Sequence, residues 1–99
     1  MKKVLILGST GSIGEQALDV IGRSGELEVC GLAAGSDWRA LLEQARSAGV
    51  RTVALADPAA AREARGSGWE GALLAGEEGV RELIAGSGAD VVLNAIVGS

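Results

Sequence analysis

Hydrophobic and polar positions along this 99-residue chain follow two patterns that alternate with each other. Short, almost fully apolar runs predict the strands of a parallel sheet, and the first of them is typical of a strand buried on both faces. They are Val4–Leu7, Leu27–Ala33, Thr52–Leu55 and Val91–Leu93, with Ala72–Leu74 as a further, shorter candidate. Between these runs, apolar residues recur three and four positions apart, which predicts amphipathic helices.

The expected helices begin and end at recognisable signals. The first ends at Ser24-Gly25 and the second runs from Trp38 to about Ala48. The third begins with Asp57 as N-cap and Pro58 in the first helical position, and the fourth is closed by Gly86. Strands alternating with helices predict an α/β fold: a doubly wound parallel sheet of the Rossmann-like kind, with helices on both faces and strand order 3-2-1-4.

Ligands of such sheets bind outside the carboxyl ends of the strands. Three turns lie there and are the candidate binding segments. They are Gly8–Gly14, Ala34–Asp37 and Asn94–Ser99.

The first turn reads G-x-x-G-x-x-G and separates a strand from a helix. Gly8 can make the tight exit from the strand, Gly11 can bring its N–H close to a phosphate, and Gly14 can allow close packing of the helix. Thr10 and Ser12 offer hydroxyl groups to phosphate oxygens. Together with the unpaired N–H groups of a helix start, this arrangement predicts a nucleotide site.

The same turn also has a purely structural interpretation. Ser12 and Glu15 fit the S-x-x-E capping box, which would satisfy the helix start internally. Glycine-rich turns between strand and helix also occur without ligands. Position within a strand–turn–helix unit favours nucleotide binding.

The second turn lies where the adenosine ribose of a dinucleotide would lie. Asp37 follows the glycines at the distance of an acid that takes ribose hydroxyls, and it is equally suited to cap the next helix. Ser36 could donate to a 2′-phosphate, and Arg39 follows within one helical turn. These residues alone leave both NAD and NADP open.

Composition excludes several other functions. The chain has a formal net charge of −4 and no His. We therefore expect no nucleic-acid surface, no zinc site and no Ser–His or Cys–His pair. The single Cys30 predicts a buried thiol and a reducing compartment, and the apolar run after Lys3 is too short for a signal peptide or a membrane span. We expect a cytoplasmic protein with no membrane partner.

The three turns together resemble the N-terminal part of the 1-deoxy-D-xylulose 5-phosphate reductoisomerase family. The resemblance is carried by Val4–Gly14 with its Thr-Gly-Ser-Ile, by Leu32–Asp37, and by Asn94–Ser99. The order and spacing of the motifs match over essentially the whole chain. Over residues 50 to 88 only the arrangement of the expected elements is similar.

The resemblance implies an NADPH-dependent oxidoreductase of isoprenoid precursor synthesis. Such enzymes rearrange 1-deoxy-D-xylulose 5-phosphate and reduce the product to 2-C-methyl-D-erythritol 4-phosphate, with Mg²⁺ or Mn²⁺ holding the substrate, and are expected to be homodimers. Carried over, Thr10, Gly11, Ser12 and Ile13 would contact the cofactor phosphates. The segment Gly35–Asp37, that is Gly35, Ser36 and Asp37, would contact the adenosine ribose and its 2′-phosphate.

Two departures from the family pattern affect what we expect. The family often has Asn where this chain has Asp37, and a carboxylate there weakens the case for NADPH. The family's enzymes are several hundred residues long, so residues 1–99 correspond to a dinucleotide-binding domain without the catalytic and C-terminal domains. No catalytic or metal-binding residue is carried over, and we expect this chain alone not to turn over substrate.

Two alternatives come from other classes of protein. One is a fragment of another NAD(P)-binding oxidoreductase, although a short-chain dehydrogenase would need a Tyr that this chain lacks. The other is a non-catalytic nucleotide-binding module.

Overall fold

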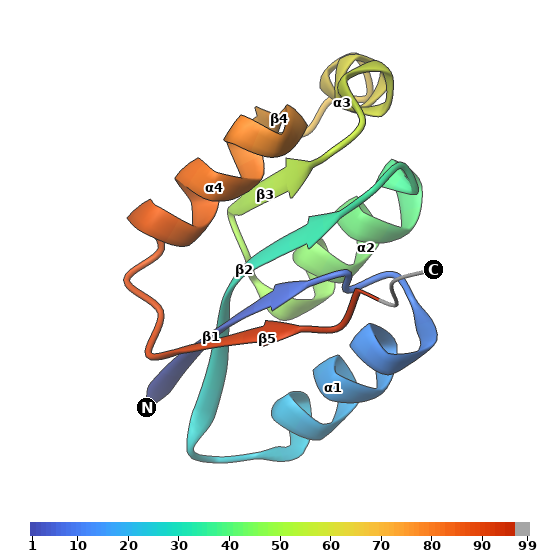
Figure 1. Ribbon diagram of the computed structural model, residues 1–99. Helices are drawn as coiled ribbons and strands as arrows, with labels where there is room; N and C mark the ends of the chain where they lie inside the picture. The colour runs from blue at the N-terminus through green and yellow to red at the C-terminus, as the bar shows by residue number, and fades with distance from the viewer. Residues whose placement is uncertain (97–99) are drawn as a thin grey trace.

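The computed structural model describes residues 1–96 and contains five strands and four helices in strict alternation. The elements are β1 (Lys2–Leu7), α1 (Ser12–Arg23), β2 (Leu27–Ala34), α2 (Trp38–Ala48), β3 (Thr52–Leu55), α3 (Pro58–Arg65), β4 (Ala72–Ala75), α4 (Gly76–Gly86) and β5 (Val91–Asn94). The strands form one parallel sheet in the order β4-β3-β2-β1-β5 (Figure 1). The α/β fold with a doubly wound parallel sheet is confirmed.

The strand order also agrees with expectation. β5 pairs with β1, with Ile6 beside Leu93 and Leu7 beside Asn94, so the last strand lies next to the first as predicted. The short run at Ala72–Leu74 is a strand and takes the opposite edge, beside β3. The carboxyl ends of β1, β2 and β5 are thereby brought to one side of the sheet.

Helices cover the two faces of the sheet unequally (Figure 1). One face packs Ile6 and Leu32 against apolar residues of α1, α2 and α3, such as Leu42, which is 1% exposed. The other face packs Leu5, Leu7 and Ala54 mainly against Leu83 of α4. Ala, Val, Leu and Ile supply this core because the chain has no Phe or Tyr.

The exposure of Cys30 differs from the prediction. The residue is partly exposed because the first half of β2 is less covered than its second half, so the prediction of a buried thiol is wrong. Burial is still sufficient to raise the pKa of the Cys30 thiol above its ordinary value. The thiol therefore stays protonated near neutral pH and is a poor nucleophile.

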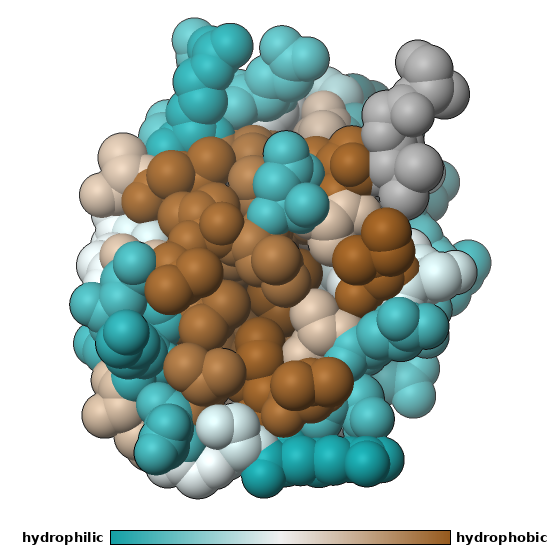
Figure 2. Space-filling view, turned by 60° about the horizontal axis from the view of Figure 1, so that its bottom comes forward, coloured by the Kyte–Doolittle hydropathy of each residue, from teal (hydrophilic) through white to brown (hydrophobic). Residues whose placement is uncertain are grey.

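One face of the molecule remains apolar. Figure 2 shows a broad hydrophobic area on the side where α1 and the edge strand β5 lie in Figure 1. Val20 on α1 is 63% exposed, and Val91 and Val92 on β5 are 43% and 44% exposed. β5 has a neighbour on one side only, so its other side is an open sheet edge within the described residues.

None of the helices formed by residues 1–96 combines the length and the apolar character that crossing a membrane requires.

The packing predicts a sharp contrast between two truncations to alanine. Leu42→Ala should lower the free energy of unfolding by about 2–5 kcal/mol, because it leaves a cavity under α2. Val20→Ala should change it by less than about 0.5 kcal/mol, because that side chain is exposed and alanine favours helix. Urea unfolding followed by circular dichroism measures both, and equal losses would contradict this core.

Candidate cofactor site

The glycine-rich loop leaves β1 by a turn that requires glycine. Gly8 has a φ of +80°, and a Cβ there would lie 2.9 Å from the Ile96 nitrogen. The N–H groups of Gly8 and Ser9 both donate to the carbonyl of Ala33 on β2, at 2.8 and 3.1 Å. The loop is therefore held against the neighbouring strand, and Gly8 makes the tight exit that the sequence predicts.

Gly14 sets how closely α1 approaches this loop. A Cβ on Gly14 would collide with the Gly8 carbonyl oxygen and would lie 2.6 Å from the Ser9 Cα. The glycine allows the first turn of α1 to pack directly on the loop backbone. Gly11, by contrast, has room for a Cβ, whose nearest neighbour would be the Gly8 oxygen at 3.7 Å.

The first turn of α1 has free N–H groups. Gly11 is the N-cap, no side chain caps the helix, and within residues 1–96 the N–H groups of Ser12, Ile13 and Gly14 have no acceptor. The capping box of Ser12 and Glu15, the structural alternative for this turn, is not formed, because Ser12 is already inside the helix. An uncapped helix start has partial positive charge and unpaired donors, which suits an anion.

The starts of α2 and α3 are different. Asp37 accepts a 3.3 Å hydrogen bond from the Ala40 N–H, and Asp57 accepts one of 3.0 Å from the Ala59 N–H. Asp37 and Asp57 therefore satisfy their own helices, as the sequence predicts for both. The starts of α1 and α4 have no side-chain cap, and of these two the start of α1 directly follows the glycine-rich loop.

The second candidate turn is exposed and lies beside the end of β3. Gly35, Ser36 and Asp37 are all exposed. The Gly35 carbonyl accepts a 2.9 Å hydrogen bond from the Asp57 N–H. The capping role of Asp37 is thus confirmed, and contact of this turn with a ribose or a 2′-phosphate stays a prediction.

The third turn is described as far as residue 96. Asn94 Oδ1 accepts a 3.0 Å hydrogen bond from the Ile96 N–H, and the Ala95 N–H donates to the Leu7 carbonyl at 2.8 Å. This part of the turn therefore packs against the exit of β1. Residues 97–99, the rest of the predicted segment, lie outside the described residues.

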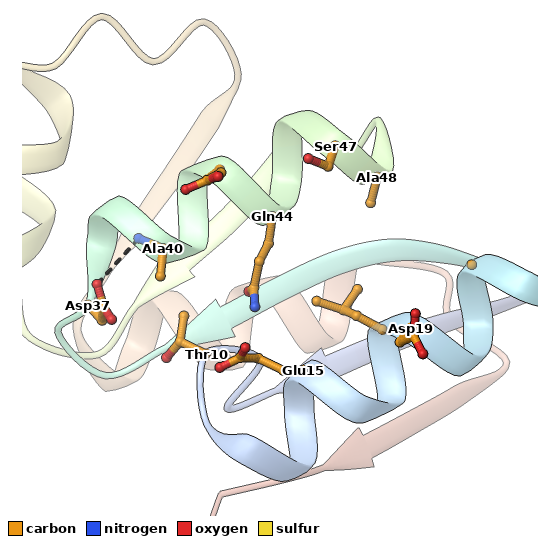
Figure 3. A pocket seen from close by; sticks show the side chains of 11 residues that line it. Thr10, Glu15, Asp19, Asp37, Ala40, Gln44, Ser47 and Ala48 are labelled. Atoms are coloured by element: carbon orange, nitrogen blue, oxygen red, sulfur yellow. Dashed lines mark hydrogen bonds between the residues drawn. The ribbon is translucent and has the colours of Figure 1, made fainter.

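A groove of about 560 Å³ runs between α1 and α2 from the candidate site (Figure 3). Thr10 and Asp37 both line it, so the structure brings the first and second turns together. The remaining sequence-predicted residues Gly11, Ser12, Ile13, Gly35 and Ser36 do not line it. Its volume is within the range of small-molecule pockets.

The charge of this groove limits what can lie in it. Its lining includes the carboxylates of Glu15, Asp19, Asp37 and Glu43 and no Lys or Arg. Asp19 forms an ion pair with Arg23 at 3.1 Å, outside the lining. Phosphate groups would be repelled from the depth of the groove.

Sequence reasoning missed two residues that shape the loop. Ser9 is fully buried, and Gln44 on α2 donates from Nε2 to the Ser9 carbonyl at 2.9 Å. Ser9 lies inside the glycine pattern and could have been noticed there. Gln44 carries no local signal, because its partner is 35 residues away.

Comparison with known proteins agrees with this geometry. The family model described as 1-deoxy-D-xylulose 5-phosphate reductoisomerase matches residues 4–99. The chain belongs to the 1-deoxy-D-xylulose 5-phosphate reductoisomerase family. It is 50% identical to the enzyme of that name from Rhodococcus jostii and 52% identical to that from Nocardia farcinica, in each case over 98% of this chain and 24% of the relative.

Solved structures of the family share the fold. The reductoisomerase from Zymomonas mobilis in complex with NADPH superimposes with a TM-score of 0.85 at 31% identity, covering 98% of this chain and 26% of that one. A family structure with NADPH, fosmidomycin and magnesium gives a TM-score of 0.82 at 27% identity, covering 99% and 25%. The chain thus spans about a quarter of the length of these reductoisomerases.

The contact between α1 and the loop yields a matched pair of glycine substitutions. Gly14→Ala should destabilise the fold by about 1–3 kcal/mol, because the added methyl meets backbone that cannot move aside. Gly22→Ala, in the same helix with nothing within 4 Å of an added Cβ, should stabilise it by up to about 1 kcal/mol. Thermal unfolding of both variants measures the difference, and a stabilising Gly14→Ala would contradict the close contact.

Proposed function

We propose that residues 1–99 are the NADPH-binding domain of a 1-deoxy-D-xylulose 5-phosphate reductoisomerase. The observation that carries the proposal is the uncapped start of α1, where the N–H groups of Ser12, Ile13 and Gly14 lack acceptors among residues 1–96. Cofactor diphosphates are bound at such helix starts in Rossmann-type folds. Membership of a family whose solved structures include NADPH complexes supports the same assignment.

The cofactor-binding residues in this proposal are those that the family resemblance assigns. Thr10, Gly11, Ser12 and Ile13 would contact the phosphates, and Gly35, Ser36 and Asp37 would contact the adenosine ribose and its 2′-phosphate. Support comes from the exposure of all of these residues except the half-buried Thr10, and from their position at the carboxyl ends of neighbouring strands β1 and β2.

The carboxylate of Asp37 is unfavourable for the binding of NADPH. Its carboxylate would lie close to a 2′-phosphate and repel it, whereas the two hydroxyls of an NADH ribose could donate to it. Ser36 offers the 2′-phosphate a hydroxyl donor. The capping bond to Ala40 already occupies one oxygen of Asp37, which reduces what the carboxylate can offer a ribose.

The activity of the whole protein follows from the family and is proposed with it. A chain of the relatives' length would rearrange and reduce 1-deoxy-D-xylulose 5-phosphate to 2-C-methyl-D-erythritol 4-phosphate, as a cytoplasmic homodimer. Within residues 1–96 no three metal-ligating side chains are grouped, so we place the divalent cation and the sugar phosphate on the other domains. Residues 1–99 alone would then bind NADPH without turnover.

The apolar face of α1 and β5 fits this view of a longer protein. Val20, Val91 and Val92 are exposed there, and the edge of β5 is open. We propose that this face packs against the remaining domains in a chain of the relatives' length, because burial would remove exposed apolar area and pair the free backbone groups of the edge.

The first test is a titration of the 99-residue chain with NADPH and with NADH. We expect saturable binding of NADPH, tighter than that of NADH, detected by the fluorescence of Trp38, which adjoins Asp37 at the start of α2. Amide shifts should concentrate at residues 10–13 and 35–37. Tighter NADH binding would assign Asp37 to the ribose hydroxyls, and binding of neither would contradict the proposal.

The second test isolates the charge of Asp37. Asp37→Asn should tighten NADPH binding by about tenfold, the effect of roughly 1.4 kcal/mol of removed repulsion, with little change for NADH. Asparagine is also a good N-cap, so the melting temperature should change little. Glu43→Gln, which removes a charge from the same groove further along α2, is the matched control and should leave the NADPH:NADH ratio unchanged.

Isothermal calorimetry of the unmodified chain and the two variants with both cofactors gives the six dissociation constants without relying on Trp38. An Asp37→Asn variant that loses NADPH affinity would contradict placement of the 2′-phosphate at this turn. An equal gain from Glu43→Gln would indicate a general effect of net charge instead.

A further inference from the structure

Gln44, in the middle of α2, reaches across to the glycine-rich loop. Its Nε2 donates a 2.9 Å hydrogen bond to the Ser9 carbonyl, and the contact is partly buried. Figure 3 shows the side chain pointing from α2 toward the loop that carries Thr10. In the described part of the chain, no other side chain donates to the backbone of residues 8–11.

This hydrogen bond fixes the orientation of one peptide group. The Ser9 carbonyl and the Thr10 N–H belong to the same planar trans peptide, so they point in opposite directions. Holding the carbonyl toward Gln44 therefore directs the Thr10 N–H away from Gln44. That N–H has no acceptor among residues 1–96, as is also true of the N–H groups of Ser12 and Ile13.

The Gln44 amide carries an energetic penalty in this position. Its Oε1 is buried without a partner, and so is the Oγ of Ser9. Buried polar atoms without partners are destabilising; a methionine of similar length would remove the unpaired Oε1 but would leave the buried Ser9 carbonyl without its donor. The arrangement is explained if the donor on Nε2 is what the position requires.

A carboxylate could not replace the amide here. Glutamate is the isosteric alternative, but its ionised form accepts hydrogen bonds only and would repel the Ser9 carbonyl. It would also add a further negative charge to a groove that already has four carboxylates in its lining. A neutral donor meets both requirements.

We propose that Gln44 is a positioning residue for cofactor binding: by holding the Ser9 carbonyl it sets the direction of the Thr10 N–H, one of the groups proposed to contact the phosphates. The inference rests on the proposed function, because it assumes that this loop binds the cofactor. It assigns Gln44 no contact with the cofactor.

The test uses three variants of the 99-residue chain. Gln44→Met keeps the length and removes the donor, Gln44→Lys keeps a donor, and Ser47→Ala is the control one turn further along the same groove. Amide shifts of Thr10 and Gly11 are recorded without cofactor, NADPH dissociation constants are measured by calorimetry, and the folded fraction is followed by circular dichroism.

We expect Gln44→Met to displace the Thr10 and Gly11 amides in the free protein. It should also weaken NADPH binding by about tenfold, the scale of one lost hydrogen bond. Gln44→Lys should return both amides toward their original positions, and Ser47→Ala should change neither readout. A merely structural role would lower the melting temperature and leave the loop amides and the affinity of the folded fraction unchanged.

Unmoved loop amides in Gln44→Met, or identical amides in the Met and Lys variants, would overturn the inference. Should Gln44→Met fail to fold, wild-type-like loop amides in Gln44→Lys would support it and displaced ones would overturn it. Absence of NADPH binding by the unmodified chain would instead overturn the proposed function and the cofactor role of Gln44 with it, and the amides of the free variants would then show only whether Gln44 orients the loop.

Discussion

The contact between the first turn of α1 and the backbone that leaves β1 governs the geometry of the whole candidate site. Gly14 has no Cβ, so the helix starts directly against Gly8 and Ser9. Because Gly8 turns back with positive φ and is tied to Ala33 of β2, the helix start is fixed relative to two strands at once. The free N–H groups of α1 are therefore rigidly placed at the carboxyl edge of the sheet, which is what anion binding by backbone requires.

The sequence predicts most of this framework because the signals are local. The apolar runs Val4–Leu7 and Thr52–Leu55 are covered on both faces of the parallel sheet, and Asp57-Pro58 marks a helix start by itself. Asp37 is equally local, since its capping bond to Ala40 spans only three residues. Even the strand order follows, because right-handed crossovers leave few ways to arrange alternating strands and helices.

Sequence reasoning fails or is silent at residues whose surroundings are set by segments far away in the sequence. Ser12 fits a capping box in sequence, but the tight packing of Gly14 on the loop makes Gly11 the N-cap and places Ser12 inside the helix. Cys30 lies in an apolar run, yet how much of β2 is covered depends on helices that come later in the chain. The hydrogen bond from Gln44 to Ser9 joins two elements through the fold and leaves no pattern in either.

The charge distribution explains why the sequence signal of the candidate cofactor site consists of glycines rather than basic residues. The chain carries a net charge of −4, and the groove beside the loop is lined by four carboxylates with no Lys or Arg. The lining of this groove offers a phosphate no cationic side chain, whereas the backbone N–H groups of a helix start attract an anion at short range and only when they point toward it. The contacts of Gly8, Gly14 and the Ser9 carbonyl set the direction of these N–H groups. The proposed phosphate site therefore depends on the geometry of the loop. If the loop binds the cofactor as proposed, a change that rotates one of its peptides without altering charge would therefore change the cofactor affinity more than the removal of a distant carboxylate would.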